Sequence, residues 1–497
     1  MIASAATKTW VEKRIPAVER AKYMSGIVDF IDDAAIERDL SAHCVSDPGR
    51  VRDIIQKSLA IQTLTPSETA QLLNVCDPAL LAEMESAALE IKKKVYDNRI
   101  VTFAPLYLSA VCINNCQYCG FRSENTAIRR GVLTQDQVRR ETEVLAGSIG
   151  HKRLIAVYGE HPASDTDYIA ETLRTIYSVQ TKTEKGRGAI RRINVNSAPL
   201  TVADLRILHE TGLGTYQVFQ ETYHHETYRR MHPAGTLKAD YQWRAYCMHR
   251  AMEAGIDDVG IGALFGLYNW KFEVMGLLYH ALELERAFGI GPHTISFPRI
   301  EPAENTPLTG SLPYAVSDAE FRRAVTVLRL AVPYTGMILT ARESADMRNA
   351  MIPLGITQMD ASSRVGLGAY SDVDAAQQPD RQQFILGDTR TLDELVGWLA
   401  ANGYITSFCT AGYRCGRTGK CIMDLLRTGQ EGKFCKLNAV ITYREWLDDF
   451  ASAATKTAGE AVIDKEIAEI RVKNPKVFDA FMKNYDRTKA GERDLYF

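Results

Sequence analysis

The sequence has almost no excess charge of either sign and no long uninterrupted apolar run. Its 497 residues carry 59 Lys and Arg against 61 Asp and Glu, a formal net charge of −2. No broad field therefore favours nucleic acid or an anionic membrane as a partner. Charges or prolines interrupt the longest apolar runs before 18 residues, so we expect no transmembrane helix. The first 24 residues lack the apolar core and small-residue cleavage site of a secretory signal, which predicts a cytoplasmic protein.

Cysteine is too scarce for a disulfide scaffold, with ten residues in the chain. Seven of the ten nevertheless fall in two groups, which are Cys112, Cys116 and Cys119, and then Cys409, Cys415, Cys421 and Cys435. In a reducing compartment, grouped thiols indicate metal or redox chemistry rather than bridges. Cys44, Cys76 and Cys247 stand alone, and we expect each of them to be a small buried side chain.

The pattern of apolar residues predicts an α/β fold. The first hundred residues are helix-like, and from about residue 101 to 365 short strand-like runs alternate with amphipathic helices. The eight strand-like runs are 102–110, 153–159, 191–197, 214–220, 257–264, 293–299, 336–342 and 356–362. Eight successive β-then-α units predict a parallel (β/α)8 barrel of the TIM type. An open doubly wound sheet remains the alternative, because periodicity does not prove closure.

Start signals and composition divide the chain into three predicted regions. Capping boxes at Thr65, Thr134 and Ser317 mark helix starts. A polar stretch at 371–381 follows the last predicted barrel unit. We therefore expect an N-terminal helical extension (1–95), a barrel (96–370), and a helical C-terminal domain (371–497) that carries the second cysteine group.

The first cysteine group has the spacing C-x3-C-x2-C and directly follows the first predicted strand, at the barrel face where active sites lie. Three thiolates can hold three irons of a 4Fe–4S cubane and leave the fourth iron open. That iron could chelate the amino and carboxylate groups of S-adenosylmethionine, whose reductive cleavage gives a 5′-deoxyadenosyl radical. A zinc knuckle or three unrelated thiols is the weaker interpretation, because no fourth Cys or His lies at close spacing.

These residues resemble the motif of the radical S-adenosylmethionine superfamily, in which an aromatic residue, here Tyr118, precedes the third cysteine. Further segments are similar to the HydG-type tyrosine lyases that mature FeFe hydrogenase, from about residue 20 to the last residue. They include PLYLS, GEHP, RRINVN, GTYQVFQETYH, GPHTIS and GERDLYF. The resemblance implies a carbon–carbon lyase that breaks the Cα–Cβ bond of L-tyrosine to give p-cresol and dehydroglycine. It also implies an electron donor such as ferredoxin or flavodoxin.

The candidate ligands of S-adenosylmethionine lie at or after predicted strand ends. Beside Tyr118, they are Glu160 after the second strand, Gln220 and Glu221 after the fourth, and Arg250 on the next helix. A carboxylate at residue 221 could accept hydrogen bonds from ribose hydroxyls, and Arg250 would pair with the methionine carboxylate unless it is merely solvated. Gly260 and Gly262 suit either close approach of adenine or packing inside the barrel.

Arg342 ends the seventh predicted strand, and the resemblance implies that it clamps the carboxylate of the amino-acid substrate. A planar guanidinium suits that bidentate role better than an ammonium group. Ser363, after the eighth strand, is the second candidate for the substrate site. Here the chain has Ser363-Arg364-Val365 where the family has Ser-Cys-Thr.

The family carries a second cluster bound by C-x2-C-x22-C, and this chain departs from that pattern. Cys409 and Cys435 stand at the outer positions, but Gly412 replaces the middle cysteine. We expect Cys415, three residues further on, to replace the missing thiolate; Cys421 is the weaker candidate. The alternatives are an absent or labile cluster, or a four-thiolate site that binds another metal such as zinc.

In the family, the histidine that matches His293 ligates an extra iron attached to the second cluster. Dehydroglycine becomes carbon monoxide and cyanide there, for delivery to a hydrogenase-maturation scaffold. Two other functions remain open for this chain. One is a paralogous aromatic amino-acid lyase that stops at dehydroglycine, and the other is a non-catalytic iron–sulfur scaffold or carrier, which would need no cavity residues.

Overall fold

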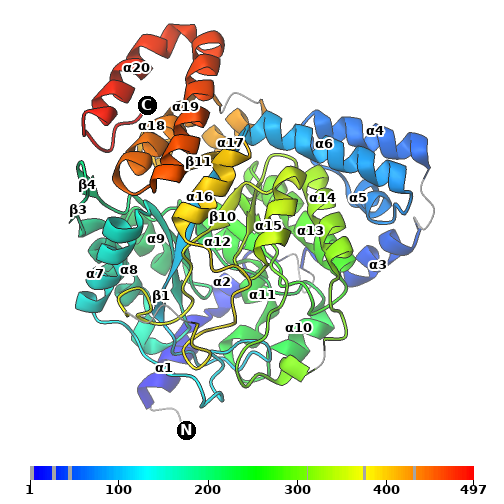
Figure 1. Cartoon of the computed structure of the whole chain (residues 1–497). Coiled ribbons are helices and arrows are strands. Elements are labelled where there is room, and N and C mark those ends of the chain that lie inside the picture. Colours follow the sequence, from blue (N-terminus) through cyan, green and yellow to red (C-terminus); the bar gives the residue numbers. More distant parts are fainter. Residues whose placement is uncertain (1–4, 25–28, 43–46, 311, 373–376, 429–431) are drawn as a thin grey trace.

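The computed structural model describes residues 5–24, 29–42, 47–310, 312–372, 377–428 and 432–497 (Figure 1). At its centre is a closed barrel of parallel strands, in which β10 pairs with β1 through the register Val101↔Gln358. Closure confirms the (β/α)8 barrel and excludes the open sheet. In barrel order the strands are β1 (Arg99–Ser109), β2 (Arg153–Tyr158), β5 (Arg192–Asn196), β6 (Tyr216–Gln217), β7 (Val259–Gly262), β8 (Thr294–Ser296), β9 (Gly336–Leu339) and β10 (Gln358–Asp360).

Each of the eight predicted runs coincides with one barrel strand, although β1 begins three residues before its predicted run. The β2 sequence Arg-Leu-Ile-Ala-Val-Tyr is buried at all but one position, as expected for a strand covered by helices on one face and by the barrel interior on the other. Except for β1, the strands are shorter than the apolar runs because pairing stops where the barrel opens into its loops. Because all eight strands are parallel, the loops that follow them lie at the same end of the barrel. The candidate site residues that follow the strands are therefore expected at that end.

Helices that alternate with the strands surround the barrel (Figure 1). The capping boxes predicted at Thr134 and Ser317 are both formed, and each begins one of these helices. The α-helices are α7 (Gln135–Glu143), α8 (Thr166–Ser178), α9 (Val202–Glu210), α10 (His225–Met231), α11 (Tyr241–Ala245), α12 (Cys247–Glu253), α13 (Trp270–Phe288), α14 (Asp318–Ala331) and α15 (Ala345–Met351). Shorter 3-10 and π-helical pieces are η1 (Val144–Ile149), η2 (Pro162–Ser164), η3 (Leu237–Ala239), η4 (Pro307–Gly310) and η5 (Ile352–Leu354).

The N-terminal residues form helices on the outside of the barrel, where α4, α5 and α6 pack against α14. The capping box at Thr65 is formed and begins α5. These helices are α1 (Ala5–Arg14), α2 (Ala17–Ala21), α3 (Asp33–Ala42), α4 (Pro48–Leu59), α5 (Pro66–Leu73) and α6 (Pro78–Tyr96). A two-stranded hairpin, β3 (Thr181–Lys182) with β4 (Arg187–Gly188), projects beside α7 and α8 (Figure 1).

The C-terminal residues form a helical layer at the amino ends of the barrel strands. A strand that the sequence did not predict, β11 (Ile405–Ser407), extends the sheet by pairing with the first residues of β1. The other elements are α16 (Leu392–Ala401), η6 (Tyr413–Cys415), α17 (Gly419–Arg427), α18 (Gly432–Asp449), α19 (Ala453–Lys473) and α20 (Pro475–Lys489). The limits 1–95, 96–370 and 371–497 stay a prediction.

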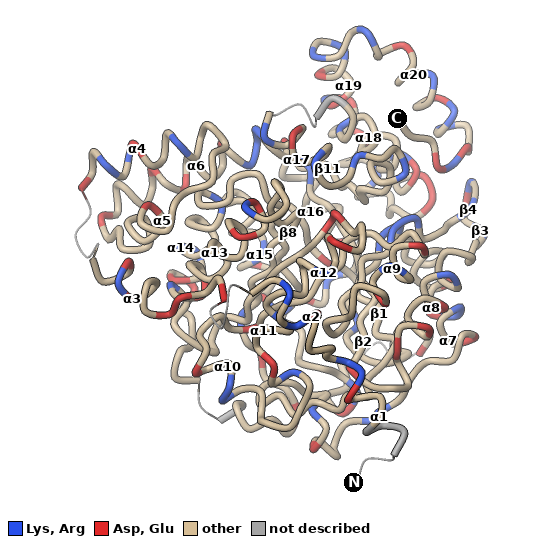
Figure 2. Tube along the Cα trace, turned by 180° about the vertical axis from the view of Figure 1, so that it is seen from behind, with Lys and Arg blue, Asp and Glu red and all other residues tan. Residues whose placement is uncertain are grey.

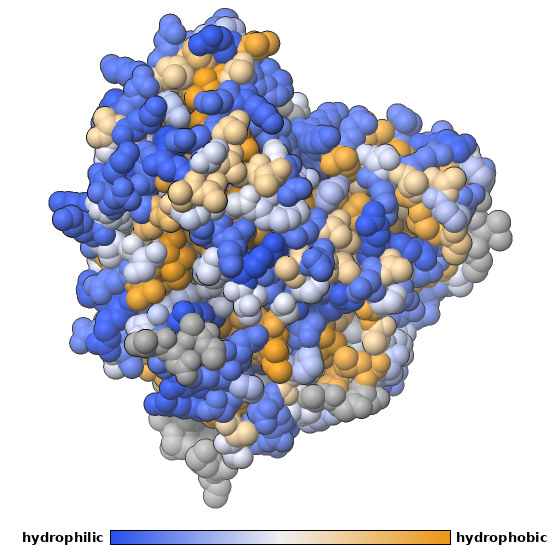
Figure 3. Space-filling view, in the orientation of Figure 1, coloured by the Kyte–Doolittle hydropathy of each residue, from blue (hydrophilic) through white to orange (hydrophobic). Residues whose placement is uncertain are grey.

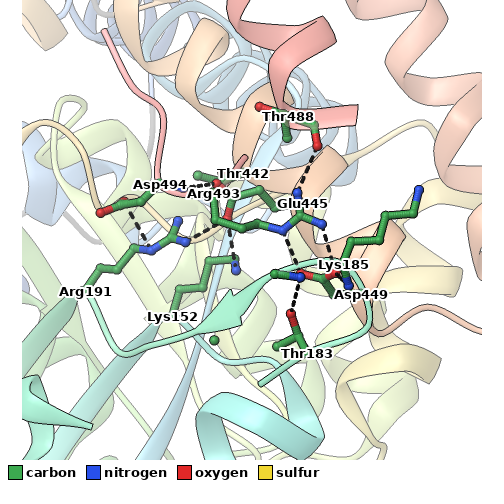
Figure 4. Close-up of polar contacts among 12 residues, drawn as sticks. Lys152, Thr183, Lys185, Arg191, Thr442, Glu445, Asp449, Thr488, Arg493 and Asp494 are labelled. Atoms are coloured by element: carbon green, nitrogen blue, oxygen red, sulfur yellow. Dashed lines mark hydrogen bonds and ion pairs between the residues drawn. The ribbon is translucent and has the colours of Figure 1, made fainter. Parts of the chain in front are cut away.

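A buried polar network joins this layer to the barrel (Figure 4). Glu445 on α18 pairs with Arg191 at 2.8 Å and with Lys152 at 3.2 Å, both at the amino ends of barrel strands. Beside them Arg493 makes two 2.8 Å bonds to Asp449. Burial, helped by the neighbouring Arg191, lowers the pKa of Lys152 to about 8. Buried charges need partners of this kind, so the network fixes how the layer sits on the barrel.

Basic and acidic residues are interspersed along the outer helices (Figure 2), and hydrophilic residues interrupt the apolar areas of the face shown in Figure 3. Across the described residues, no helix has the length and apolar character needed to cross a membrane. Cys247 is buried as expected, but the prediction for Cys76 was wrong, because this thiol is exposed. It lies in the short turn between α5 and α6. Cys44 lies outside the described residues.

Candidate functional site

A cavity of about 230 Å³ opens at the carboxyl ends of the barrel strands. The loop after β1 brings the first cysteine group to its wall, and all three thiols line it. Further wall residues come from the ends of other strands, among them Glu160, Glu221 and Arg342. The structure therefore places the predicted cysteines and three of the predicted ligands around one space.

Burial raises the pKa of the Cys112 thiol, and it raises the pKa of Cys116 to about 12. Two nearby sets of groups have smaller effects on the pKa of Cys116. The Lys238 ammonium lowers it, and the neighbouring thiols raise it. Thiols of this kind lose their protons when a metal binds, since metal charge outweighs such shifts. No three Cys, His, Asp or Glu side chains of the described chain converge as tightly as a single metal ion requires. Three thiols spread around one cavity suit a cluster, in which each iron takes one thiolate.

Glu160 is held against the cysteine loop. Its Oε2 accepts a 2.6 Å hydrogen bond from Nδ2 of Asn114, which also lies 3.7 Å from Sγ of Cys112. Oδ1 of Asn114 accepts from the backbone N–H of Lys238 at 2.9 Å. Gly159 precedes Glu160, and a Cβ there would overlap the carbonyl oxygen of Val111. Only glycine lets the strand end approach the loop so closely.

Glu221 lies in a buried cluster of cations. Its Oε1 is 2.8 Å from Nζ of Lys238 and 3.3 Å from Nη2 of Arg244. Burial raises the pKa of Glu221, but the two cations outweigh burial and lower it overall. The residue has a φ of 73°, an uncommon backbone conformation for a non-glycine residue. An ionised carboxylate in this position can accept hydrogen bonds from a bound ligand.

Tyr118 lines the same cavity, and a hydrogen bond from its hydroxyl to His232 holds its side chain in place. Its hydroxyl lies 2.8 Å from Nε2 of His232, whose Nδ1 lies 2.9 Å from the carbonyl oxygen of Tyr228. Burial and two nearby cations lower the pKa of His232 well below its usual range. The imidazole is therefore neutral, donates from Nδ1 to the carbonyl, and accepts a hydrogen bond from the Tyr118 hydroxyl at Nε2.

Arg342 stacks its guanidinium 3.3 Å above the ring centroid of Phe384. It is partly buried, and none of the described residues makes a side-chain hydrogen bond to it, so its N–H groups remain available to a ligand. Ser363 lies next to this wall, where its hydroxyl donates to Oδ2 of Asp360 at 2.5 Å. Asp360 lines the cavity and Ser363 does not, so Ser363 contacts a wall residue from behind the cavity wall.

The structure does not bring Arg250 to the cavity, which corrects that prediction. The side chain is fully buried, donates to the carbonyl oxygens of Leu200 (2.9 Å) and Trp243 (2.5 Å), and stacks on the Trp243 ring. Arg244, six residues earlier, reaches the cavity instead. Sequence cannot distinguish the two arginines, because the choice depends on where α11 ends and α12 begins.

Gln220 is buried outside the cavity lining, and neither of its amide atoms has a hydrogen-bond partner among the described residues. Gly260 and Gly262 serve barrel packing rather than the cavity. A Cβ at Gly260 would lie 2.6 Å from Oγ1 of Thr294, and one at Gly262 would lie 2.5 Å from the carbonyl oxygen of Ser296.

A segment that the sequence analysis assigned to the C-terminal region returns to the mouth of the barrel. Within residues 377–388, Gln383, Phe384 and Leu386 line the cavity. Gly387 N–H donates to the carbonyl oxygen of Ala341 at 2.8 Å, which ties the segment to the end of β9. Its polar composition resembles a linker, and nothing local in the sequence indicates that it closes the site.

At the opposite end of the barrel, His293 precedes β8 and is buried. Burial lowers its pKa, although the nearby Asp258 carboxylate opposes this. Asp258 pairs with Nη2 of Arg192 at 3.1 Å, and the Tyr413 ring covers that guanidinium. These three residues also line a larger cavity of about 970 Å³ between the barrel and the C-terminal layer. Within the described chain, Nδ1 of His293 has no hydrogen-bond partner.

The second cysteine group is not gathered around that cavity. Cys409 follows β11 and is partly buried, Cys435 lies partly buried on α18, and Cys415 and Cys421 are exposed. Sγ of Cys415 lies 3.6 Å from the carbonyl oxygen of Phe497. Cys415 is one 3-10 turn after Gly412, since its N–H donates to the Gly412 carbonyl at 3.1 Å. Side chains three residues apart in a 3-10 helix point the same way.

Comparisons with known proteins agree with this geometry. The radical SAM superfamily model matches residues 106–275, and the model of the biotin and thiamin synthesis associated domain matches residues 296–405. The 2-iminoacetate synthase of Escherichia coli (strain K12) is 30% identical over 359 residues, which is 71% of this chain and 89% of that protein.

Two solved structures described as HydG maturases of FeFe hydrogenase also match. One is 45% identical with a TM-score of 0.89, covering 95% of this chain and 100% of that one. The other, from Carboxydothermus hydrogenoformans, is 35% identical with a TM-score of 0.75, covering 92% and 98%.

A closed parallel barrel with three thiols at its catalytic end defines a radical S-adenosylmethionine enzyme. Such enzymes hold a 4Fe–4S cluster and S-adenosylmethionine, and the cavity carries the thiols and polar groups that both require. Within this class, the chain belongs to the HydG family.

Proposed function

We propose that this protein is a radical S-adenosylmethionine lyase that breaks the Cα–Cβ bond of L-tyrosine and gives p-cresol and dehydroglycine. The observation that carries the proposal is the shared cavity, in which the three thiols of the β1 loop and the stacked guanidinium of Arg342 face one space. Membership of the HydG family supports tyrosine as the substrate.

The residues of this cavity divide into two groups by chemistry. Cys112, Cys116 and Cys119 would hold the cluster. Glu160 and Glu221 are carboxylates able to accept hydrogen bonds from the amino group and ribose of S-adenosylmethionine, and Arg244 offers a cation for its carboxylate. Tyr118, fixed by His232, forms the wall beside them. When bound, the cluster and S-adenosylmethionine would supply a 5′-deoxyadenosyl radical.

Arg342 would bind the carboxylate of tyrosine. The ring of Phe384 fixes the plane of its guanidinium, so the two ligand-facing N–H groups are preorganised for a bidentate contact. Apolar side chains, among them Phe103, Ile155 and Ile338, line the same cavity and would limit water around a bound substrate. Exclusion of water protects a radical reaction from side reactions.

Product analysis tests this proposal. The reconstituted protein, supplied with reductant, S-adenosylmethionine and L-tyrosine, should form p-cresol, and it should do so without the second cluster, because cleavage needs only the first. Absence of p-cresol from protein that cleaves S-adenosylmethionine would exclude tyrosine as the substrate. Absence of any cleavage would favour the scaffold or carrier function instead.

We further propose that Cys409, Cys415 and Cys435 hold a second iron–sulfur cluster, with His293 as the ligand of an attached iron. The support is the 3-10 turn that sets Cys415 on the same side as Gly412. With this cluster, the chain would convert dehydroglycine to carbon monoxide and cyanide for a hydrogenase-maturation scaffold. A ferredoxin or flavodoxin would supply electrons to both clusters.

One observation favours a second candidate function, in which the reaction stops at dehydroglycine. Gly412 has no side chain to ligate iron, and the two thiols that follow it, Cys415 and Cys421, are exposed. The 2-iminoacetate synthase of Escherichia coli is a relative whose name describes that product. Detection of carbon monoxide and cyanide beside p-cresol separates the two functions.

A further inference from the structure

We propose that Gln383 sets the reduction potential of the radical cluster by donating a hydrogen bond to the Cys119 thiolate. Gln383 is a positioning residue in this proposal, because it acts through a cluster ligand and not on the substrate. The inference rests on the first cluster alone. It stands whether or not tyrosine is the substrate.

The contact is direct. Nε2 of Gln383 lies 3.4 Å from Sγ of Cys119, a normal distance for a hydrogen bond to sulfur. The hydroxyl of Tyr107, on β1, donates to Oε1 of Gln383 at 2.8 Å. A thiolate that ligates iron can only accept, so the N–H2 group of Gln383 faces the sulfur and its Oε1 accepts from the Tyr107 hydroxyl.

The backbone holds this side chain in place. Gly120, directly after Cys119, donates its N–H to the carbonyl oxygen of Gln383 at 3.3 Å. A Cβ at Gly120 would lie 2.7 Å from that same oxygen, so the two segments touch as closely as glycine allows. On its other side, Gln383 N–H donates to the carbonyl oxygen of Val365 at 3.3 Å.

Gln383 makes the closest contact that a side-chain amide makes with a cluster thiol in the described chain. Asn114 reaches Cys112 at 3.7 Å, but its Nδ2 is engaged by Glu160 at 2.6 Å. Cys116 receives no side-chain hydrogen bond from any described residue; the charged side chains near it are Lys238 and Glu221. The Gln383 contact is therefore the one whose removal changes the sulfur environment most.

The direction of the effect follows from charge. Reduction adds an electron to the cluster and makes its sulfurs more negative, so an N–H donor stabilises the reduced form more than the oxidised form. Burial strengthens that preference, because the dielectric around the contact is low. Gln383 therefore raises the potential and makes the cluster easier to reduce.

The test is a redox titration of the full-length reconstituted protein. Electron paramagnetic resonance monitors it through the signal of the first cluster, which is recognised because it changes when S-adenosylmethionine is added. Gln383→Leu should shift the potential to a more negative value, and Tyr107→Phe should shift it less in the same direction, because the amide is then free to turn. Gln382→Leu is the matched control, since this neighbour does not line the cavity. It should leave the potential unchanged.

Gln383→Glu guards against a folding defect in the leucine variant. It keeps the shape and the bond from Tyr107 but offers no N–H to the sulfur, so its potential should fall as well. If the leucine variant fails to bind iron, the glutamate variant decides. Potentials equal to the parent in variants with full iron content would overturn the proposal. No tyrosine is present in this titration, so a wrong substrate leaves the result intact.

Discussion

The two cysteine groups of this chain lie at opposite ends of one barrel and are built in different ways. Cys112, Cys116 and Cys119 belong to a single loop after β1, and side chains from distant parts of the chain, among them Glu160, Lys238 and Gln383, line the same cavity. Cys409 and Cys435 belong to separate elements, with an exposed 3-10 turn and α17 between them.

The difference shows what a local motif can specify. A loop of eight residues brings its own ligands together, so the site survives small changes elsewhere in the fold. Ligands spread over a strand end, a 3-10 turn and a helix depend on the packing of all three. A cysteine missing at residue 412 can therefore be replaced only by a thiol that the packing of these elements brings to the same place.

The largest effect should come from Cys116→Ala. Removing this thiolate leaves two ligands, too few to hold a cubane firmly, so formation of 5′-deoxyadenosine should fall to background. Cys76→Ser is the control, because this thiol is exposed and remote in sequence from both groups, and it should retain full activity. Unchanged cleavage in Cys116→Ala would remove the first group from the mechanism.

The second group offers a sharper test, based on iron content. Cys415→Ser should lose about four iron atoms per chain and the second-cluster signal, because a cubane needs at least three thiolates. Cys421→Ser should lose neither.

In the Cys415→Ser background, Gly412→Cys should restore both the iron content and the second-cluster signal. Residue 412 has ordinary helical dihedrals, and a Cβ there would meet only Arg417, at 3.6 Å. A full iron complement in Cys415→Ser alone would show that Cys415 is not a ligand.

Arg342→Lys should weaken tyrosine binding while leaving cleavage of S-adenosylmethionine intact. Lysine provides no planar pair of N–H groups and cannot stack on Phe384. The lost contact is worth about 1–3 kcal/mol, so the KM for tyrosine should rise roughly 5–150-fold. Arg364→Lys serves as the control, because Arg364 lies outside the cavity lining. An equal rise in both variants would indicate a general change at the mouth of the barrel.

The smallest effect is a pH dependence of stability. It comes from His225, at the start of α10, which contacts two carboxylates of the N-terminal region. The His225 imidazole lies between Asp33 (2.8 Å) and Asp29 (3.0 Å). Burial lowers its pKa, but hydrogen bonds to the two carboxylates outweigh burial and raise it to about 9. A raised folded-state pKa means that the stabilisation is complete below about pH 6.5 and disappears as the pH rises through 9.

We expect no more than about 1 kcal/mol from this contact, because the ring is partly exposed and screened by solvent. Thermal unfolding of the parent and of His225→Gln between pH 6 and 9.5 measures it. The two unfolding temperatures should differ at pH 6 and converge at pH 9.5. A constant difference would assign the effect to packing instead of charge.

Sequence predicts the barrel well because its signals are local. Eight apolar runs and three capping boxes each depend on neighbouring residues, and all of them are found in the structure. The strand β11 was missed because three residues carry no periodic signal, and its pairing with β1 joins positions about 300 residues apart.

The residues of the candidate site also differ in whether local sequence signals could identify them. The cysteine motif and the residues that end strands β2 and β9 could be found from spacing and position. Arg244, Lys238 and Gln383 could not, because each reaches the cavity through packing between distant segments. Arg250 was chosen wrongly for the same reason, since only the three-dimensional path of α11 and α12 decides which arginine faces inward.

The wall of the radical site is completed very late in the order of protein synthesis. Gln383 follows Cys119 by 264 residues, and a ribosome that adds 5–20 residues per second needs roughly 13–50 s to cover that distance. During most of this interval the barrel lacks its last strand, β10, and until its end the three thiols lack the segment that carries Gln383. The complete set of side chains around the thiols therefore exists only once that segment has been made.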